Sequence, residues 1–121
     1  MQLRHRQWKL GNCLVDEGRQ IIAHNGFEIS VRNKLLSTLV CLIEHHPKVV
    51  ESDHLIDLVW GEFSSINKAG VNHTIWCLRQ MLISIGVKEK LIETIPKRGY
   101  RINCRPVQQV SEAGIKALLA S

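Results

Sequence analysis

The sequence predicts one α+β domain with an N-terminal four-stranded antiparallel sheet, three helices and a C-terminal β-hairpin. Two patterns carry this prediction. Short apolar runs separated by turn residues fill the first part of the chain, and longer segments with apolar residues at helical spacing follow them. With 121 residues, 45% of them apolar, the chain can bury a single core. We therefore expect one domain over residues 1–106, followed by a tail or linker over residues 107–121.

The four predicted strands are the runs WKLG, CLVDE, RQIIAH and FEIS. They are separated by Gly11-Asn12, Glu17-Gly18 and Asn25-Gly26. An Asn-Gly pair between two apolar runs is a strong hairpin signal, because both central residues of that turn take positive φ. The alternation of runs and turns therefore predicts an antiparallel sheet.

Two helices are predicted next. Ser30 can cap the first, which ends at residues 45–47, His-His-Pro. Its apolar residues recur at helical spacing: Leu35, Leu36, Leu39, Leu42 and Ile43. A short extended segment, residues 49–51, leads to a second helix that Ser52 can cap and Gly61 ends, with Trp60 as a core or helix-end residue.

The third predicted helix, residues 69–83, has a buried stripe and an unusual opposite face. The stripe consists of Val71, Ile75, Leu78 and Leu82. At about 100° per residue, the opposite side presents His73, Trp76, Cys77 and Gln80, with Asn72 and Arg79 on its flank. A solvent-facing helix rarely exposes a tryptophan, so this face is a candidate contact surface.

A basic hairpin is predicted from the runs LIETI and YRINC, which residues 96–99 join. Lys97 and Arg98 fall at its tip, and Gly99 is expected to supply the positive φ of the turn. Tyr100 is expected to pack its ring at the base of the hairpin. Because Arg101 follows, three basic side chains lie on one tight turn and its edge.

The charge is polarised along the chain. The formal net charge is +5, which is compatible with an anionic partner. Residues 44–62 carry five acids and one base, whereas residues 97–105 carry four bases and no acid. The C-terminal hairpin is therefore the strongest candidate for contact with an anion.

Several other classes of function are disfavoured. The sequence has no Gly-rich phosphate loop, no GxSxG or HExxH motif and no carboxylate pair with a pocket signature, so we predict no enzymatic activity and no cofactor. His45 and His46 lack a convergent ligand set, and the dipole of the first helix explains them without a metal. No segment approaches the roughly 18 apolar residues of a membrane span.

The four cysteines are widely spaced and form no CxxC pair. We interpret them as reduced thiols in the cytoplasm, without a metal site. Spacing leaves open a disulfide between Cys13 and Cys104, and it also leaves open a redox role for Cys77 on its exposed face.

A polar outward helix face followed by a basic hairpin is how a winged helix-turn-helix meets duplex DNA. The exposed helix enters the major groove, and the hairpin, or wing, reaches phosphates or the adjacent minor groove. Extended cationic side chains such as Lys97 and Arg98 suit a narrow, negatively charged groove.

Residues 7–104 closely resemble the OmpR/PhoB-type winged-helix DNA-binding domain of bacterial transcription regulators. The resemblance rests on three motifs in order, VVxxxxLxxxVWG, VxxxIxxLRxxL and TxxxxGYR. The PKRGYR wing, with no receiver domain ahead of it, resembles the ToxR/CadC branch, whose members carry this domain at the N-terminus of a membrane-anchored regulator. The resemblance thus implies a cytoplasmic domain, with an anchor and the regulatory part C-terminal to it.

The resemblance also implies a division of roles. Cys77 stands where the family commonly has a basic residue, and Gln80 and Met81 stand where lysine or arginine is frequent. Guanine readout by arginine is therefore reduced, which leaves His73, Trp76 and Gln80 as the expected base readers. Arg79, Thr74 and Thr94 are expected at phosphates, and Asn72, Cys77, Lys97, Arg98 and Arg101 complete the candidate DNA-binding set.

The sequence is also compatible with two alternative functions, and the resemblance implies two further partners. The chain can instead be a winged-helix protein–protein interaction module with weak DNA affinity, using the face of Trp76. It can also be a response-regulator fragment that has lost its receiver, although Met1 lies only seven residues before the first predicted strand. By resemblance, the loop of residues 62–68 can contact RNA polymerase, and the domain is expected to bind DNA as a homodimer or in tandem.

Overall fold

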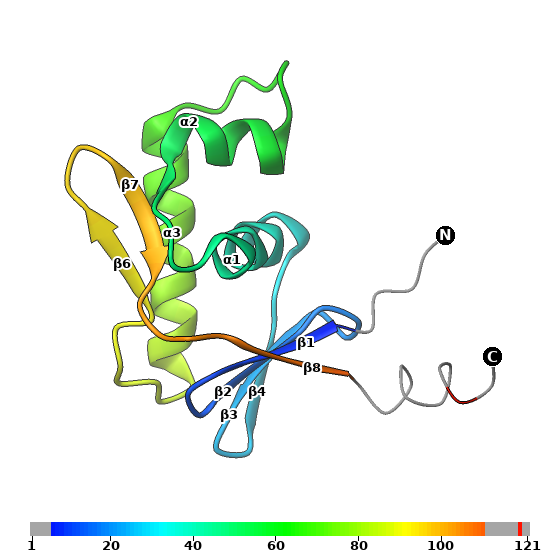
Figure 1. Cartoon of the computed structure of the whole chain (residues 1–121). Coiled ribbons are helices and arrows are strands. Elements are labelled where there is room, and N and C mark those ends of the chain that lie inside the picture. Colours follow the sequence, from blue (N-terminus) through cyan, green and yellow to red (C-terminus); the bar gives the residue numbers. More distant parts are fainter. Residues whose placement is uncertain (1–5, 111–118, 120–121) are drawn as a thin grey trace.

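The computed structural model describes residues 6–110 and residue 119. Three helices lie between two antiparallel sheets, one at each side of the helical layer (Figure 1). The predicted α+β class and winged helix-turn-helix arrangement are confirmed.

The N-terminal sheet begins with the four predicted strands. They are β1 (Arg6–Leu10), β2 (Cys13–Asp16), β3 (Ile21–His24) and β4 (Phe27–Ser30), paired antiparallel in sequence order. The β3–β4 turn has Asn25 at φ 48° and Gly26 at φ 85°, as the Asn-Gly signal predicted.

The sheet has five strands, so the prediction of four was wrong. The fifth, β8 (Val107–Val110), pairs antiparallel with β1 and places Val107 opposite Lys9. The expected tail over residues 107–121 therefore starts with a strand of the sheet, and its remainder lies outside the described residues apart from residue 119. A four-residue run with two central glutamines has little strand signal of its own, and the edge of β1 is what orders it.

Helix α1 (Asn33–His45) starts later than expected. Ser30 belongs to β4, and Arg32 occupies the cap position without a side-chain cap bond. The short strand β5 (Val50–Glu51) follows, as predicted, and the next helix begins at Ser52 itself. Ser30 pairs with Ile21 of β3 and is therefore not available to cap a helix. This pairing depends on a distant strand, so the local sequence does not indicate it.

The second helix has an irregular second half. An α-helical turn, α2 (Ser52–Leu55), continues as a π-helical segment, η1 (Ile56–Trp60), in which the N–H of Gly61 donates to the carbonyl of Ile56 at 3.0 Å. Gly61 ends it at φ 94°, a left-handed conformation that favours glycine. Trp60 is half-buried against the core, as predicted.

Helix α3 (Lys68–Ser84) contributes the predicted stripe to the core. Val71, Ile75, Leu78 and Leu82 are each at most 4% exposed and pack with the buried side of α1. Asn67 caps the helix, accepting from the N–H of Gly70 at 3.0 Å. Burial of this stripe turns the opposite side of α3 outward.

The last sheet contains the wing. Strands β6 (Ile92–Ile95) and β7 (Gly99–Ile102) form the predicted hairpin, and β5 pairs with the other edge of β7. The wing lies alongside α3, whereas the five-stranded sheet lies at the far end of the helical layer (Figure 1).

All four cysteines are free thiols. Burial raises the pKa of Cys13 to about 12, with smaller contributions from Cys104 and Glu89. Burial also raises the pKa of Cys41 to about 11, with a smaller contribution from Glu44. Within the described part of the chain, no helix has the length and apolar character needed to cross a bilayer.

Leu78 offers a direct test of the core. Leu78→Ala should lower the free energy of unfolding by about 2 to 5 kcal/mol, because the side chain is fully buried and its removal leaves a cavity. Urea denaturation followed by circular dichroism measures this. Ile83→Ala, which truncates a side chain 61% exposed on the same helix, is the control and should change stability little. Equal effects of the two substitutions would show that the buried face of α3 is wrongly assigned.

Candidate nucleic-acid interface

The outward side of α3 presents the polar and aromatic residues that the sequence predicted. Asn72, His73 and Gln80 are exposed, Cys77 is half-buried, and Trp76 is 56% exposed. The rings of His73 and Trp76 stack with centroids 5.9 Å apart and an interplanar angle of 16°. The Sγ of Cys77 lies 3.5 Å from Nε2 of His73. We call His73, Trp76 and Cys77 the aromatic face of α3.

Thr74 does not join this face. It is 8% exposed, and its hydroxyl donates to the carbonyl of Gly70 at 3.0 Å. The expectation that Thr74 contacts a phosphate is therefore not supported by its position, because it lies one residue from the buried stripe and its hydroxyl is satisfied within the helix.

Arg79 connects α3 to the wing. Its Nη2 donates to the carbonyl of Ile92 at 2.9 Å and to the hydroxyl of Thr94 at 2.7 Å. Its Nε is buried without a hydrogen-bond partner among the described residues. Arg79 and Thr94 were both expected at phosphates, but here they bond to each other and hold β6 against α3.

The tip of the wing carries two exposed cations. Lys97 and Arg98 are exposed, and within the described residues neither side chain has an ion-pair partner. The residue in the left-handed conformation is Lys97, at φ 63°, so assigning the turn's positive φ to Gly99 was incomplete. Gly99 is required mainly by close approach to β5, since a Cβ there would lie 2.0 Å from the carbonyl oxygen of Val50.

Tyr100 fixes the base of the wing, as predicted. It is 6% exposed, and its hydroxyl donates to Oδ1 of Asn72 on α3. Burial raises the pKa of the Tyr100 phenol, with a smaller opposing effect from Arg79. Arg101, across the hairpin from Glu93, pairs with its carboxylate at 3.1 Å, so its charge is partly neutralised.

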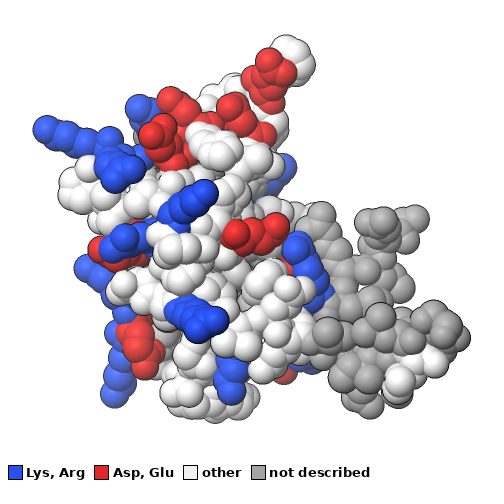
Figure 2. All heavy atoms as spheres, in the orientation of Figure 1, with Lys and Arg blue, Asp and Glu red and all other residues white. Residues whose placement is uncertain are grey.

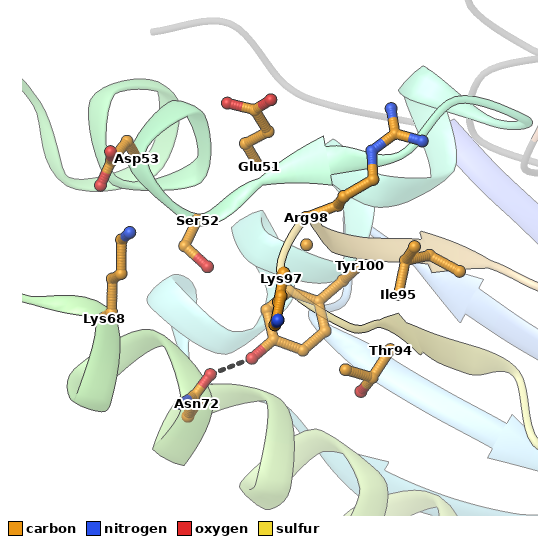
Figure 3. Close-up of a pocket in the computed structure, with 11 residues that line it drawn as sticks. Glu51, Ser52, Asp53, Lys68, Asn72, Thr94, Ile95, Lys97, Arg98 and Tyr100 are labelled. Carbon is orange, nitrogen blue, oxygen red and sulfur yellow. Dashed lines mark hydrogen bonds between the residues drawn. The ribbon is translucent and has the colours of Figure 1, made fainter.

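A hollow of about 410 Å³ separates the start of α2, the start of α3 and the wing (Figure 3). Its walls come from these three elements and from the end of β5, and they include Glu51, Ser52, Asp53, Lys68, Asn72, Thr94, Ile95, Lys97, Arg98, Gly99 and Tyr100. It is open to solvent and combines three cations with two carboxylates. The residues around the hollow therefore form one continuous surface, which extends from the polar start of α3 to the basic wing.

Lys68 and Ser52 line this surface but were not among the candidate residues predicted from the sequence. Both fall at the first turn of a helix, whereas Lys68 was expected at the end of the loop of residues 62–68. The signal that can find them is the helix start, since residues at the start of two packed helices can reach one ligand together. On the visible side, Asp and Glu gather at the top, over α2, whereas Lys and Arg predominate on the wing side, with some Asp and Glu among them (Figure 2).

The described residues contain no group of three His, Cys, Asp or Glu side chains placed to hold a metal ion. The surface consists of a helix with exposed polar and aromatic residues and a hairpin with two exposed cations at its tip. These features suit contact with an extended anionic partner more than chemistry on a small substrate.

A helix pair followed by an outward-facing third helix and a two-stranded wing defines a winged helix-turn-helix domain. Residues 26–102 match the family described as "Transcriptional regulatory protein, C terminal". The chain belongs to this family, a family of transcription regulators and not of enzymes, in agreement with the prediction from sequence.

The relatives are bacterial regulators. The chain is 30% identical to the transcriptional activator CadC of Escherichia coli K12 over 114 residues, which cover 93% of this chain and 22% of CadC. It is 36% identical to the transcriptional regulator HilA of Salmonella typhi over 84 residues, or 69% of this chain and 15% of HilA. The chain thus spans less than a quarter of either relative.

Solved structures show the same fold. The DNA-binding domain of Escherichia coli CadC superposes with a TM-score of 0.77 at 29% identity, covering 85% of this chain and 96% of that domain. The DNA-binding domain of Klebsiella pneumoniae RstA, solved in complex with the RstA box, superposes with a TM-score of 0.66 at 18% identity, covering 79% and 95%. The second likeness concerns the fold alone.

A substitution of Arg79 tests whether its hydrogen bonds to Ile92 and Thr94 stabilise the fold. Arg79→Met should lower the free energy of unfolding by about 1 to 3 kcal/mol, because it removes two charge-assisted hydrogen bonds and leaves the carbonyl of Ile92 without its donor. Gln80→Ala, at the exposed neighbouring position, is the control and should change stability by less than about 0.5 kcal/mol. Unchanged unfolding by Arg79→Met would contradict the bracing role.

Proposed function

We propose that this domain binds double-stranded DNA sequence-specifically, with α3 in the major groove and the wing on the backbone or the adjacent minor groove. The observation that carries the proposal is the hollow, which is lined both by Asn72 of α3 and by Lys97 and Arg98 of the wing. Trp76 and Gln80 follow Asn72 at intervals of one helical turn, so they continue outward from the same surface.

The proposed contacts divide into positioning and reading. Lys97, Arg98 and Lys68 are exposed cations beside the hollow, and they suit phosphates, which fix the domain on the duplex without reading sequence. His73, Trp76 and Gln80 are exposed on α3 and suit base edges. Arg79, Thr94 and Arg101 are engaged within the domain, and we assign them to holding the wing in position.

Asp53 and Glu51 constrain how DNA fits this surface. Both carboxylates line the hollow beside the cations. A phosphate that entered deeply between them would meet like charges, which is unfavourable in a partly enclosed site. We therefore place the backbone at the wing side of the hollow, near Lys97 and Arg98, rather than against the start of α2.

Further partners extend this proposal. We propose that the domain acts in the cytoplasm, binds repeated half-sites as a homodimer or in tandem, and contacts RNA polymerase through residues 62–68. In this loop Phe63 is 97% exposed, so one aromatic side chain of the kind enriched at protein interfaces is available there. A membrane anchor outside this chain is proposed from the family resemblance alone.

A protein-interaction module is the alternative, and the exposure of Trp76 favours it, since exposed aromatic residues are common anchors at protein interfaces. A DNA-binding titration at several salt concentrations separates the two functions. A log-affinity that falls linearly with log-salt supports DNA binding, whereas negligible affinity at low salt supports the alternative.

The wing gives the first test of DNA binding. Replacing Lys97 and Arg98 by alanine should weaken binding to all sequences and reduce the slope of log-affinity against log-salt by about one to two units, because one or two phosphate contacts are lost. Fluorescence anisotropy with labelled duplexes measures the slope. Lys88→Ala, at an exposed lysine outside the hollow, is the matched control. An unchanged slope in the wing variant would remove the wing from the interface.

The helix gives the second test. Gln80→Ala and His73→Ala should each cost about 1 to 3 kcal/mol of affinity for the specific site and leave non-specific binding nearly unchanged, because base contacts discriminate more than they attract. Cys77→Arg should raise affinity generally and shift preference toward guanine-containing half-sites. Selection of sites from random duplexes at fixed salt measures all three. Identical selected motifs for parent and variants would show that α3 does not read bases.

A further inference from the structure

The exposed surface of α3 differs in chemistry from the wing beside it. Its one arginine, Arg79, is turned toward Ile92 and Thr94 and is unavailable to a base edge in this arrangement. When His73 is counted as neutral, the aromatic face carries no formal charge, and Gln80 adds a single amide. The bidentate guanidinium contact that reads guanine O6 and N7 therefore has no source on this face.

The aromatic face instead presents ring surface, and its side chains contact one another. Stacking of His73 and Trp76, with an interplanar angle of 16°, restricts the indole, and the thiol of Cys77 lies against the imidazole. Trp76 nevertheless leaves 56% of its surface exposed. Burial of such an exposed, restrained ring against an apolar group is favourable. The ring loses little side-chain entropy on binding, because its rotation is already restricted.

The major groove contains few apolar groups that the Trp76 ring can contact. Base edges present nitrogen and oxygen donors and acceptors, and the apolar group among them is the methyl on C5 of thymine. A 5-methylcytosine presents the same methyl at the equivalent position. Resting on the proposed DNA-binding function, we infer that the aromatic face of α3 reads the C5-methyl group of a pyrimidine, with the Trp76 indole as its principal contact.

Gln80 makes this inference more specific. It lies one turn beyond Trp76, about 6 Å along the helix axis, which corresponds to roughly two base-pair steps. A glutamine amide can pair with adenine N6 and N7. The two residues together therefore select a half-site in which a methylated pyrimidine lies about two steps from an adenine.

The experiment removes the methyl and nothing else. In the half-site obtained by selection, each thymine in turn is replaced by uracil, and dissociation constants are measured for the parent, Trp76→Ala and Gln80→Ala. At one position, uracil should weaken the parent by about three- to fivefold, the effect of exposing one methyl group. Trp76→Ala should bind the thymine and uracil duplexes equally, whereas Gln80→Ala, the matched variant, should still distinguish them.

A second pair of duplexes distinguishes the source of the methyl. At the sensitive position, 5-methylcytosine should bind the parent more tightly than cytosine, and the difference should vanish in Trp76→Ala. Equal binding of thymine and uracil by the parent, equal binding of the two cytosines, or a thymine preference that survives in Trp76→Ala would each overturn the inference. Specific binding that persists in those cases would leave the proposed DNA-binding function standing, whereas loss of all duplex binding would count against both.

Discussion

Burial of the apolar stripe of α3 is the constraint on which the interface depends. Leu78 and Val71 have no exposed surface, and Ile75 has 1%. Each buried side chain of this size contributes about 1.5 to 3 kcal/mol relative to exposure, so rotating the helix about its axis is strongly unfavourable. Because residues on a helix keep fixed angles to one another, anchoring the stripe also fixes where His73, Trp76 and Gln80 point.

The wing is held by a second set of contacts that act across elements. Arg79 reaches from α3 to β6, Tyr100 reaches from β7 to Asn72, and Gly99 lets β7 approach Val50 of β5. Two of these contacts join the hairpin to α3, and the third joins it to β5. A hairpin of two four-residue strands is marginal by itself, so these contacts are what give Lys97 and Arg98 a defined position relative to α3.

The distribution of charge and apolar surface divides the work of binding. Cations lie at the wing and at the start of α3, acids lie on α2, and the middle of α3 is aromatic. In the proposed complex with DNA, the wing supplies the long-range attraction to the polyanion, and the aromatic surface of α3, which has little charge, supplies the short-range discrimination. Separating the two allows affinity and sequence preference to change independently.

Periodicity and turn chemistry alone determined much of this protein. The stripe of α3, the Asn25-Gly26 turn and the basic hairpin are local patterns, because side-chain spacing and φ preference are properties of neighbouring residues. The outward residues His73, Trp76 and Gln80 followed from the same spacing.

Tertiary structure decided what local pattern cannot contain. In the folded chain, Val107–Val110 pairs with β1, and Ser30 lies in a strand. Thr74 is buried, and Arg79, which was expected at a phosphate, instead donates a hydrogen bond to Thr94. Each outcome depends on a partner far away in sequence, and a polar side chain takes whichever hydrogen-bond partner the packed fold brings within reach. The sequence by itself thus determined which residues lie on the buried and the outward faces of the helices and the hairpin. Long-range packing decided which polar groups on the outward faces remain free to bind.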